Sequence, residues 1–156
     1  MPRLSVILLS VVVVLLAACG GSGRMSKTAY QQSLQTDGKA LQQAVTALSG
    51  GSTSVTSLAQ LATRVDAAEA SVQKAADDLA SIKAPKDAEA DNTAIVAALR
   101  AIQTGLENVK KTATSGDAAA VQKAAAAIET LPQLKAAEKA VGDLKAKGYK
   151  VGVLGS

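Results

Sequence analysis

The sequence contains no histidine, tryptophan or phenylalanine, one cysteine and two tyrosines. Without histidine, the chain cannot build a histidine-ligated zinc or haem site, or a catalytic triad with a histidine base. One cysteine cannot form a disulfide framework. Tyr30 and Tyr149 alone do not supply the aromatic platforms on which single-stranded nucleic acids stack. These absences exclude most metalloproteins, histidine-dependent enzymes and disulfide scaffolds.

The remaining polar residues form no recognisable catalytic or metal-binding pattern. Asp87, Glu89 and Asp91 alternate near an expected helix start but lack the glycine turn of a calcium loop. The net charge of +4 arises from lysines interleaved with acidic residues. This pattern favours contact with anionic lipid headgroups or an acidic wall polymer over nucleic acid. We therefore expect no enzyme activity, no metal ion and no nucleic-acid partner.

The N-terminus has the organisation of an export signal. Arg3 precedes the largely apolar run Leu4–Leu16, which is shorter than the roughly 20 residues that span a bilayer. Small residues and then a cysteine follow, in the order Leu16-Ala17-Ala18-Cys19. This tetrad resembles the lipobox of bacterial lipoproteins, in which the cysteine is lipidated and becomes the first mature residue.

The resemblance implies a signal peptide over residues 1–18, which ends in Leu16, Ala17 and Ala18 and is cleaved directly before Cys19. It also implies diacylglycerol and acyl lipid on Cys19, which would anchor the protein stably at the outer side of a membrane. Position 20 is glycine rather than aspartate, so the usual inner-membrane retention signal is missing. The expected location is therefore the cell membrane of a Gram-positive bacterium or the outer membrane of a Gram-negative one.

The rest of the chain predicts a helical domain after a tether. Residues 19–26 form the lipidated cysteine and a flexible Gly/Ser tether, and residues 27–147 are rich in alanine and other helix formers. Helix breakers divide this part into four expected helices: 27–48, 54–83 after a cap at 52–54, a third from Pro85 to before Gly116, and 117–147. Pro132 must kink the last helix or split it in two.

Apolar stripes recur at heptad-like spacing on these helices, with Leu58, Val65, Val72 and Leu79 as the most regular example. Long helices with such stripes and short connections pack as a bundle. We expect an all-α, antiparallel up-down four-helix bundle with a thin, alanine-rich core. With Cys19, the tether and the sequence Leu79-x-x-Ile82-x-x-Pro85, the chain resembles small alanine-rich lipoproteins of unknown function.

Two further features suggest contact sites. The C-terminal tail, residues 148–156, carries Tyr149, Val151 and Val153 in an alternating pattern that is typical of extended backbone. The tail either folds back over the end of the bundle or adds to a partner through these residues. Asp37 and Asn92 fall on the apolar stripes, where they mark a kink and a helix start or form a small polar site in the core.

Two functions are compatible with this pattern. The first is a non-enzymatic envelope module that docks a protein partner or wall polymer, for which we expect an exposed apolar tail or helix face. The alternative is a carrier or sensor of a small apolar ligand held between helices, for which we expect a buried, alanine-lined cavity.

Overall fold

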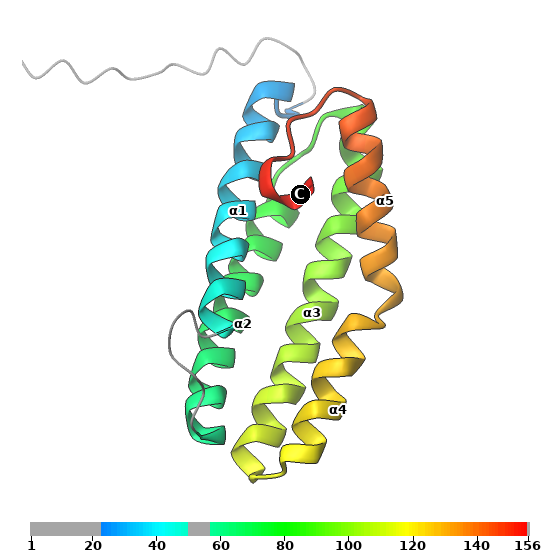
Figure 1. Cartoon of the computed structure of the whole chain (residues 1–156). Helices are drawn as coiled ribbons and strands as arrows, with labels where there is room; N and C mark the ends of the chain where they lie inside the picture. Colours follow the sequence, from blue (N-terminus) through cyan, green and yellow to red (C-terminus); the bar gives the residue numbers. More distant parts are fainter. Residues whose placement is uncertain (1–22, 50–56, 156) are drawn as a thin grey trace, which may run out of the picture.

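The computed structural model describes residues 23–49 and 57–155 (Figure 1). The predicted signal peptide, with Leu16, Ala17 and Ala18, the predicted lipidation site Cys19 and the predicted cap at 52–54 lie outside these residues. The described part is a helical bundle and contains no strand. The prediction of an all-helical domain is therefore confirmed for this part of the chain.

Five α-helices and two short 3-10 turns make up the described residues. In order they are α1 (Lys27–Leu48), α2 (Leu58–Ser81), η1 (Lys86–Ala88), α3 (Glu89–Ser115), α4 (Ala118–Glu129), α5 (Pro132–Ala146) and η2 (Gly152–Gly155). Among these helices none is long and apolar enough to cross a membrane.

Side-chain caps fix where three of the helices begin. Ser26, Ser57 and Asp117 each accept a hydrogen bond from the backbone N–H three residues later, at 2.9–3.2 Å. Such caps satisfy N–H groups that a helix leaves unpaired at its N-terminus. Gly116 ends α3 with φ +82, a left-handed conformation that glycine adopts readily. The predicted break at Gly116 and helix start at Asp117 are confirmed.

The second and third helices differ from the prediction at three ends. The second helix begins after Ser57 and not at residue 54, and it ends at Ser81 and not at Lys83. Pro85 precedes a 3-10 turn, so α3 starts only at Glu89. Residues 82–84 leave the helix before Pro85, and Met25 N–H donates to the Lys83 carbonyl at 2.8 Å. Residues 24–26, assigned to the flexible tether, therefore include residues that pack on the bundle.

The C-terminal helical region is divided around Pro132. The α4 helix ends at Glu129, and Pro132 lies in the first turn of α5 after the extended residue Leu131. Proline suits this place because the N–H that it lacks would have no helical partner there.

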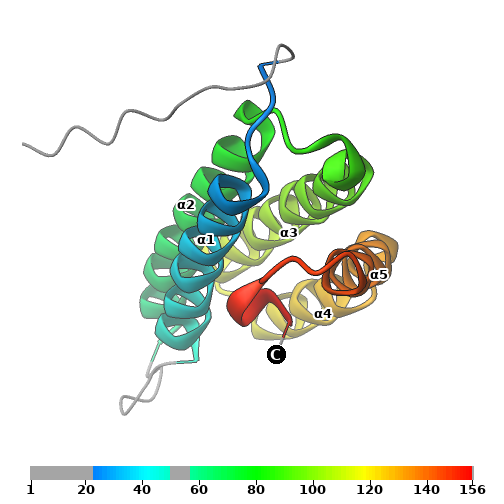
Figure 2. The same ribbon diagram turned by 90° about the horizontal axis from the view of Figure 1, so that it is seen from above.

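The helices do not pack equally on one another. The largest contact joins α2 to α3, where small residues such as Ala68 and Ala75 are buried beside Val65, Val72 and Leu79. The α1 helix packs on α2, while α4 and α5 both pack on α3. In contrast, α1 has no extensive contact with α4 or α5, and the tail segment η2 contacts both α1 and α5 (Figure 2).

Candidate functional site

An apolar groove runs along the bundle between α1 and the α4–α5 pair, with α2 and α3 as its floor. Its volume is about 730 Å³, within the range of about 300–1,000 Å³ typical of small-molecule sites. Residues from all five α-helices and the tail line it: Leu41, Ala44, Val45, Leu48, Leu61, Val65, Ala68, Val72, Ile95, Ala98, Leu99, Ile102, Leu106, Val109, Ala125, Ile128, Glu129, Leu134, Ala137, Glu138, Val141 and Leu154.

The lining is apolar apart from two acidic side chains, Glu129 and Glu138, on α4 and α5. Five of the lining residues are alanines, whose small side chains leave the space that larger residues would fill. On the α1 side, Val45 is 64% exposed, and among the described residues it is the one large hydrophobic side chain that is exposed. Nine of the lining residues are themselves buried, so the groove is a hollow between helices whose rim, with Val45, is open to solvent.

The groove is long. On α3 its lining extends from Ile95 to Val109, a distance of about 21 Å at about 1.5 Å per residue. The groove is thus long enough to lie along an extended hydrocarbon chain.

The groove exists because one pair of helices does not close the bundle. Leu41 and Leu48 belong to the apolar stripe of α1, and Leu134 and Val141 to that of α5. The structure leaves these stripes facing a shared space, with no extensive contact between their helices. A stripe shows which face of a helix is apolar, but not whether a protein neighbour or a ligand covers it. The sequence raised a site between helices only as an alternative and did not locate it.

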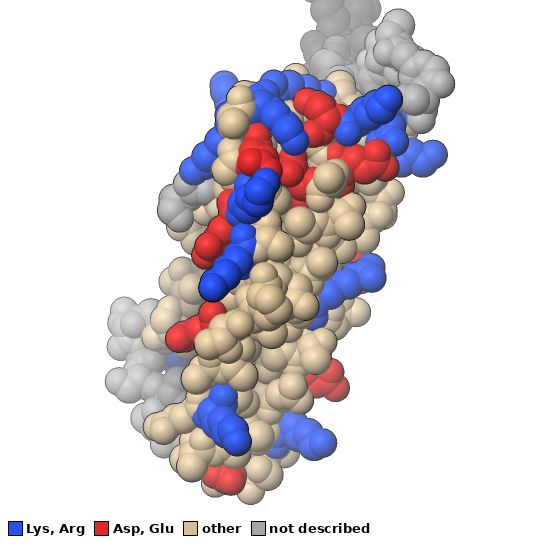
Figure 3. Space-filling model, turned by 90° about the vertical axis from the view of Figure 1, so that its right-hand side faces the viewer, with Lys and Arg blue, Asp and Glu red and all other residues tan. Residues whose placement is uncertain are grey.

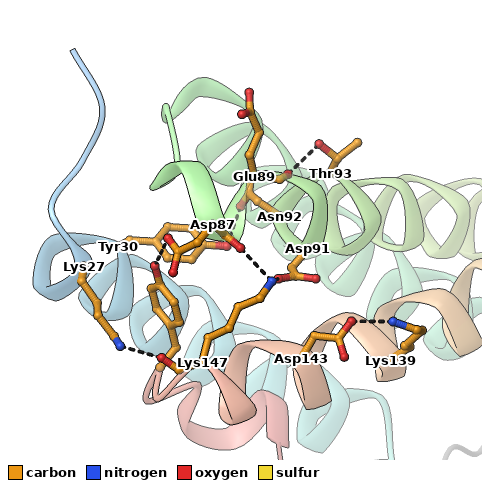
Figure 4. A network of polar contacts seen from close by, with 11 residues as sticks. Lys27, Tyr30, Asp87, Glu89, Asp91, Asn92, Thr93, Lys139, Asp143 and Lys147 are labelled. Carbon is orange, nitrogen blue, oxygen red and sulfur yellow. Dashed lines mark hydrogen bonds and ion pairs between the residues drawn. The ribbon is translucent and has the colours of Figure 1, made fainter. Parts of the chain in front are cut away.

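The end of the bundle near the tail has a different, polar character (Figure 4). Tyr30 on α1 is fully buried and its hydroxyl donates to Asn92 Oδ1 at 3.1 Å. The amide of Asn92 in turn donates to the Leu79 carbonyl at the end of α2, at 3.0 Å. Burial raises the pKa of the Tyr30 phenol well above its usual value, with Asp91 adding to the effect. Asn92 therefore links three helices, and it also lines a surface hollow together with Glu89 and Thr93.

A lysine and a tyrosine near the tail continue this polar cluster. Lys147 Nζ bonds to Asp91 Oδ2 at 2.6 Å and to the Asp87 carbonyl at 2.7 Å. The Tyr149 hydroxyl donates to Asp87 Oδ1 at 2.8 Å, and burial together with this carboxylate raises the pKa of Tyr149 to about 12. Lys27 Nζ lies 4.5 Å from the centre of the Tyr149 ring. These contacts fasten the start of the tail to α1 and α3.

Asp37, the other predicted polar stripe residue, lies apart from Asn92 on the α1–α2 side of the bundle. Its side chain is only 6% exposed and lines a separate surface hollow of about 450 Å³ with Asp78 and Ser81. The pKa of Asp37 is raised to about 6, mainly by burial and also by the nearby Asp78, while Lys74 opposes the shift. The predicted polar core is therefore two separate features, and α1 continues as one helix through Asp37 and Gly38.

The predicted partner-contact residues of the tail are packed within the chain. Tyr149 is 4% and Val151 3% exposed, while Val153 is partly buried. The backbone forms a 3-10 turn over Gly152–Gly155 and not an extended strand. The tail thus folds over the end of the bundle, and Tyr149 and Val151 cannot contact a partner in this conformation.

Charged side chains gather towards the same end of the molecule on the face formed by α4 and α5, whereas much of the rest of that face is uncharged (Figure 3). Within residues 23–49 and 57–155, no three acidic, histidine or cysteine side chains lie together as metal ligands would. No family model, curated protein or solved structure matches this chain.

Proposed function

We propose that this chain is a membrane-anchored envelope lipoprotein that holds the acyl chain of a single-chain lipid in the groove between its helices. One observation carries the proposal: an apolar groove, open at its rim, with a volume of about 730 Å³. A concave, mainly apolar site of this volume is typical of small-molecule sites. On that ground we prefer the carrier, the second of the two functions raised by the sequence.

The dimensions of the groove support an acyl chain as the occupant. A leaflet of a bilayer, half of a hydrocarbon core about 30 Å thick, holds a chain of about 15 Å, which is shorter than the groove.

The two charged lining residues select against one class of headgroup. Glu129 and Glu138 are both acidic, so a carboxylate or phosphate held beside them would be repelled. A neutral headgroup avoids this repulsion. A monoacylglycerol combines one acyl chain with an uncharged head, and we take it as the best probe of the site.

The location and arrangement of the domain are part of the same proposal. The lipobox-like tetrad supports lipidation of Cys19 and anchoring at the outer side of a cell membrane or at an outer membrane. The short connections at residues 116–117 and 130–131 support an up-down order of helices in which α4 and α5 act as one element bent at Pro132. A lipid-binding groove on a tethered domain would then lie beside the membrane that supplies its ligand.

The groove is tested by displacement of the neutral dye Nile red from the purified protein by monopalmitin. Ala137 lines the groove on α5, whereas its neighbour Ala136 is exposed and does not. We expect Ala137→Trp to fill the groove and weaken monopalmitin binding at least tenfold, and Ala136→Trp to bind like the unmodified chain. If monopalmitin does not bind, or if both variants bind it equally, the groove is not the site and docking of an envelope protein or acidic polymer becomes the better account.

The anchor is tested by the intact mass of the protein recovered from membranes, beside a Cys19→Ser variant. We expect a mass that corresponds to residues 19–156 plus acyl chains, and no lipidated species from the variant. A soluble product cleaved elsewhere, or an uncut precursor, would overturn the lipoprotein assignment without affecting the groove.

A further inference from the structure

The C-terminal segment, residues 149–155, is held firmly against the end of the bundle. Gln31 and Gln35, one turn apart on α1, donate to the backbone carbonyls of Gly148 and Lys150, at 3.5 and 3.4 Å. Tyr149, between these two carbonyls, and Val151, directly after them, are buried, at 4% and 3% exposure. The segment is therefore fixed to α1 by its backbone and by its apolar side chains together.

The last described turn brings this segment to the groove. Leu154 lines the groove, and its backbone N–H donates to the Val151 carbonyl at 3.3 Å. A Cβ atom at Gly38 on α1 would lie 3.0 Å from Val153 Cγ2 and 3.1 Å from Leu154 Cγ, closer than side chains normally approach. Glycine at position 38 thus lets the turn sit directly on α1.

Leu154 lies where α1 and α5 would otherwise leave the groove open. The segment η2 contacts both helices and bridges them at the end that carries the polar cluster (Figure 2). An apolar side chain held at that position forms an end wall. The two acidic lining residues, Glu129 and Glu138, come from α4 and α5 and not from this segment, so the wall itself presents only apolar surface.

We infer that Leu154 is the stop against which the methyl end of the bound acyl chain rests, and that it sets the longest chain the groove accepts. This inference rests on the proposed lipid-binding function and names the residue that determines its specificity. The preferred ligand is a monoacylglycerol whose chain ends at Leu154.

The test is a series of monoacylglycerols of increasing length, from monocaprin to monostearin, titrated against the purified protein. Each methylene that enters an apolar site strengthens binding about fourfold. We expect affinity to rise by that factor per methylene and then to stop rising at a definite length. In Leu154→Trp the plateau should begin about two methylenes earlier, and in Leu154→Ala about two methylenes later, since the wall advances or retreats by a comparable distance.

Leu131 supplies the matched control, because it is a partly buried leucine outside the groove. Leu131→Ala and Leu131→Trp should leave the plateau where it is in the unmodified chain. If both Leu154 variants keep the original plateau, or if both move it in the same direction, Leu154 is not the stop, although the lipid-binding function stands. If no monoacylglycerol binds the unmodified chain, the proposed function itself is wrong and the inference falls with it.

Discussion

The rings of Tyr30 and Tyr149, the two aromatic side chains of the sequence, meet edge to face with 5.8 Å between their centres and an interplanar angle of 85°. Tyr30 lies near the start of α1 and Tyr149 in the tail, so their contact joins the two ends of the described chain. Each hydroxyl then bonds to the 87–92 region at the start of α3. This pair organises the end of the bundle that holds the tail in place.

Removing the two hydroxyls should have unequal effects. In Tyr30→Phe the buried Oδ1 of Asn92 loses its donor, and leaving a buried acceptor unpaired costs about 1–3 kcal/mol. In Tyr149→Phe the exposed carboxylate of Asp87 is rehydrated, so we expect a loss below about 1 kcal/mol. Urea unfolding of both variants measures the difference. Equal losses, or a larger loss for Tyr149→Phe, would show that the Tyr30–Asn92 hydrogen bond does not contribute as described.

Two helical glycines should respond in opposite ways to alanine. Nothing lies within 4 Å of a Cβ at Gly142, whereas a Cβ at Gly105 would lie 2.5 Å from Ile128 Cγ1 on α4. Alanine is favoured over glycine in a helix by up to about 1 kcal/mol, so Gly142→Ala should stabilise the protein by roughly that amount. Gly105→Ala must push α4 away from α3. Even after the same gain in helix propensity, it should destabilise the protein by about 1–2 kcal/mol.

The free energies of unfolding of these two variants test the close packing of α3 on α4. A stable Gly105→Ala protein would mean that Ile128 moves aside without loss, and that the contact is looser than described. Gly142→Ala serves as the control for helix propensity alone.

Asp37 should make the protein less stable as the pH rises through weakly acidic values. Its pKa is raised from 3.8 to about 6 in the folded chain, so the folded state binds more protons than the unfolded state between about pH 4 and pH 6. The free energy of unfolding therefore falls as pH rises through this window. Asp37→Asn should remove that fall and be more stable than the unmodified chain at neutral pH, by on the order of 1 kcal/mol after solvent screening.

Thermal unfolding of Asp37→Asn at pH 4.5 and pH 7.5 checks this expectation. Asp77→Asn, which changes an exposed aspartate on α2, is the matched control and should leave the pH dependence unchanged. An Asp37→Asn protein that is less stable than the unmodified chain at pH 7.5 would show that the ionised carboxylate is a favourable partner in the folded state.

The helical class and most helix positions could be predicted because they depend on local sequence. Gly116, Asp117 and Pro132 act through backbone conformation and capping, and all three mark helix ends in the structure. The end of α2 could not be predicted in the same way. Residues 82–84 leave the helix before Pro85, and Met25 N–H donates to the Lys83 carbonyl, a contact between segments far apart in the chain.

The candidate site was less accessible to sequence reasoning. Its lining residues are the same leucines, valines and isoleucines that were assigned to a closed core, because burial by a neighbour and exposure to a groove require the same apolar pattern. Asn92 was recognised as unusual, but its partner Tyr30 lies 62 positions away. The docking of the tail likewise depends on Gly38, whose role is visible only from its distance to Val153 and Leu154.

The most direct test of lipid binding in the groove is methyl NMR of the protein during titration with monopalmitin. Ile102 and Leu134 line the groove from α3 and α5, whereas Val96 lines a polar hollow elsewhere on α3. We predict that the methyl signals of Ile102 and Leu134 shift in a saturable way and that those of Val96 do not. Saturable binding that shifts Val96 and leaves Ile102 and Leu134 unchanged would contradict the account, as would the absence of any binding.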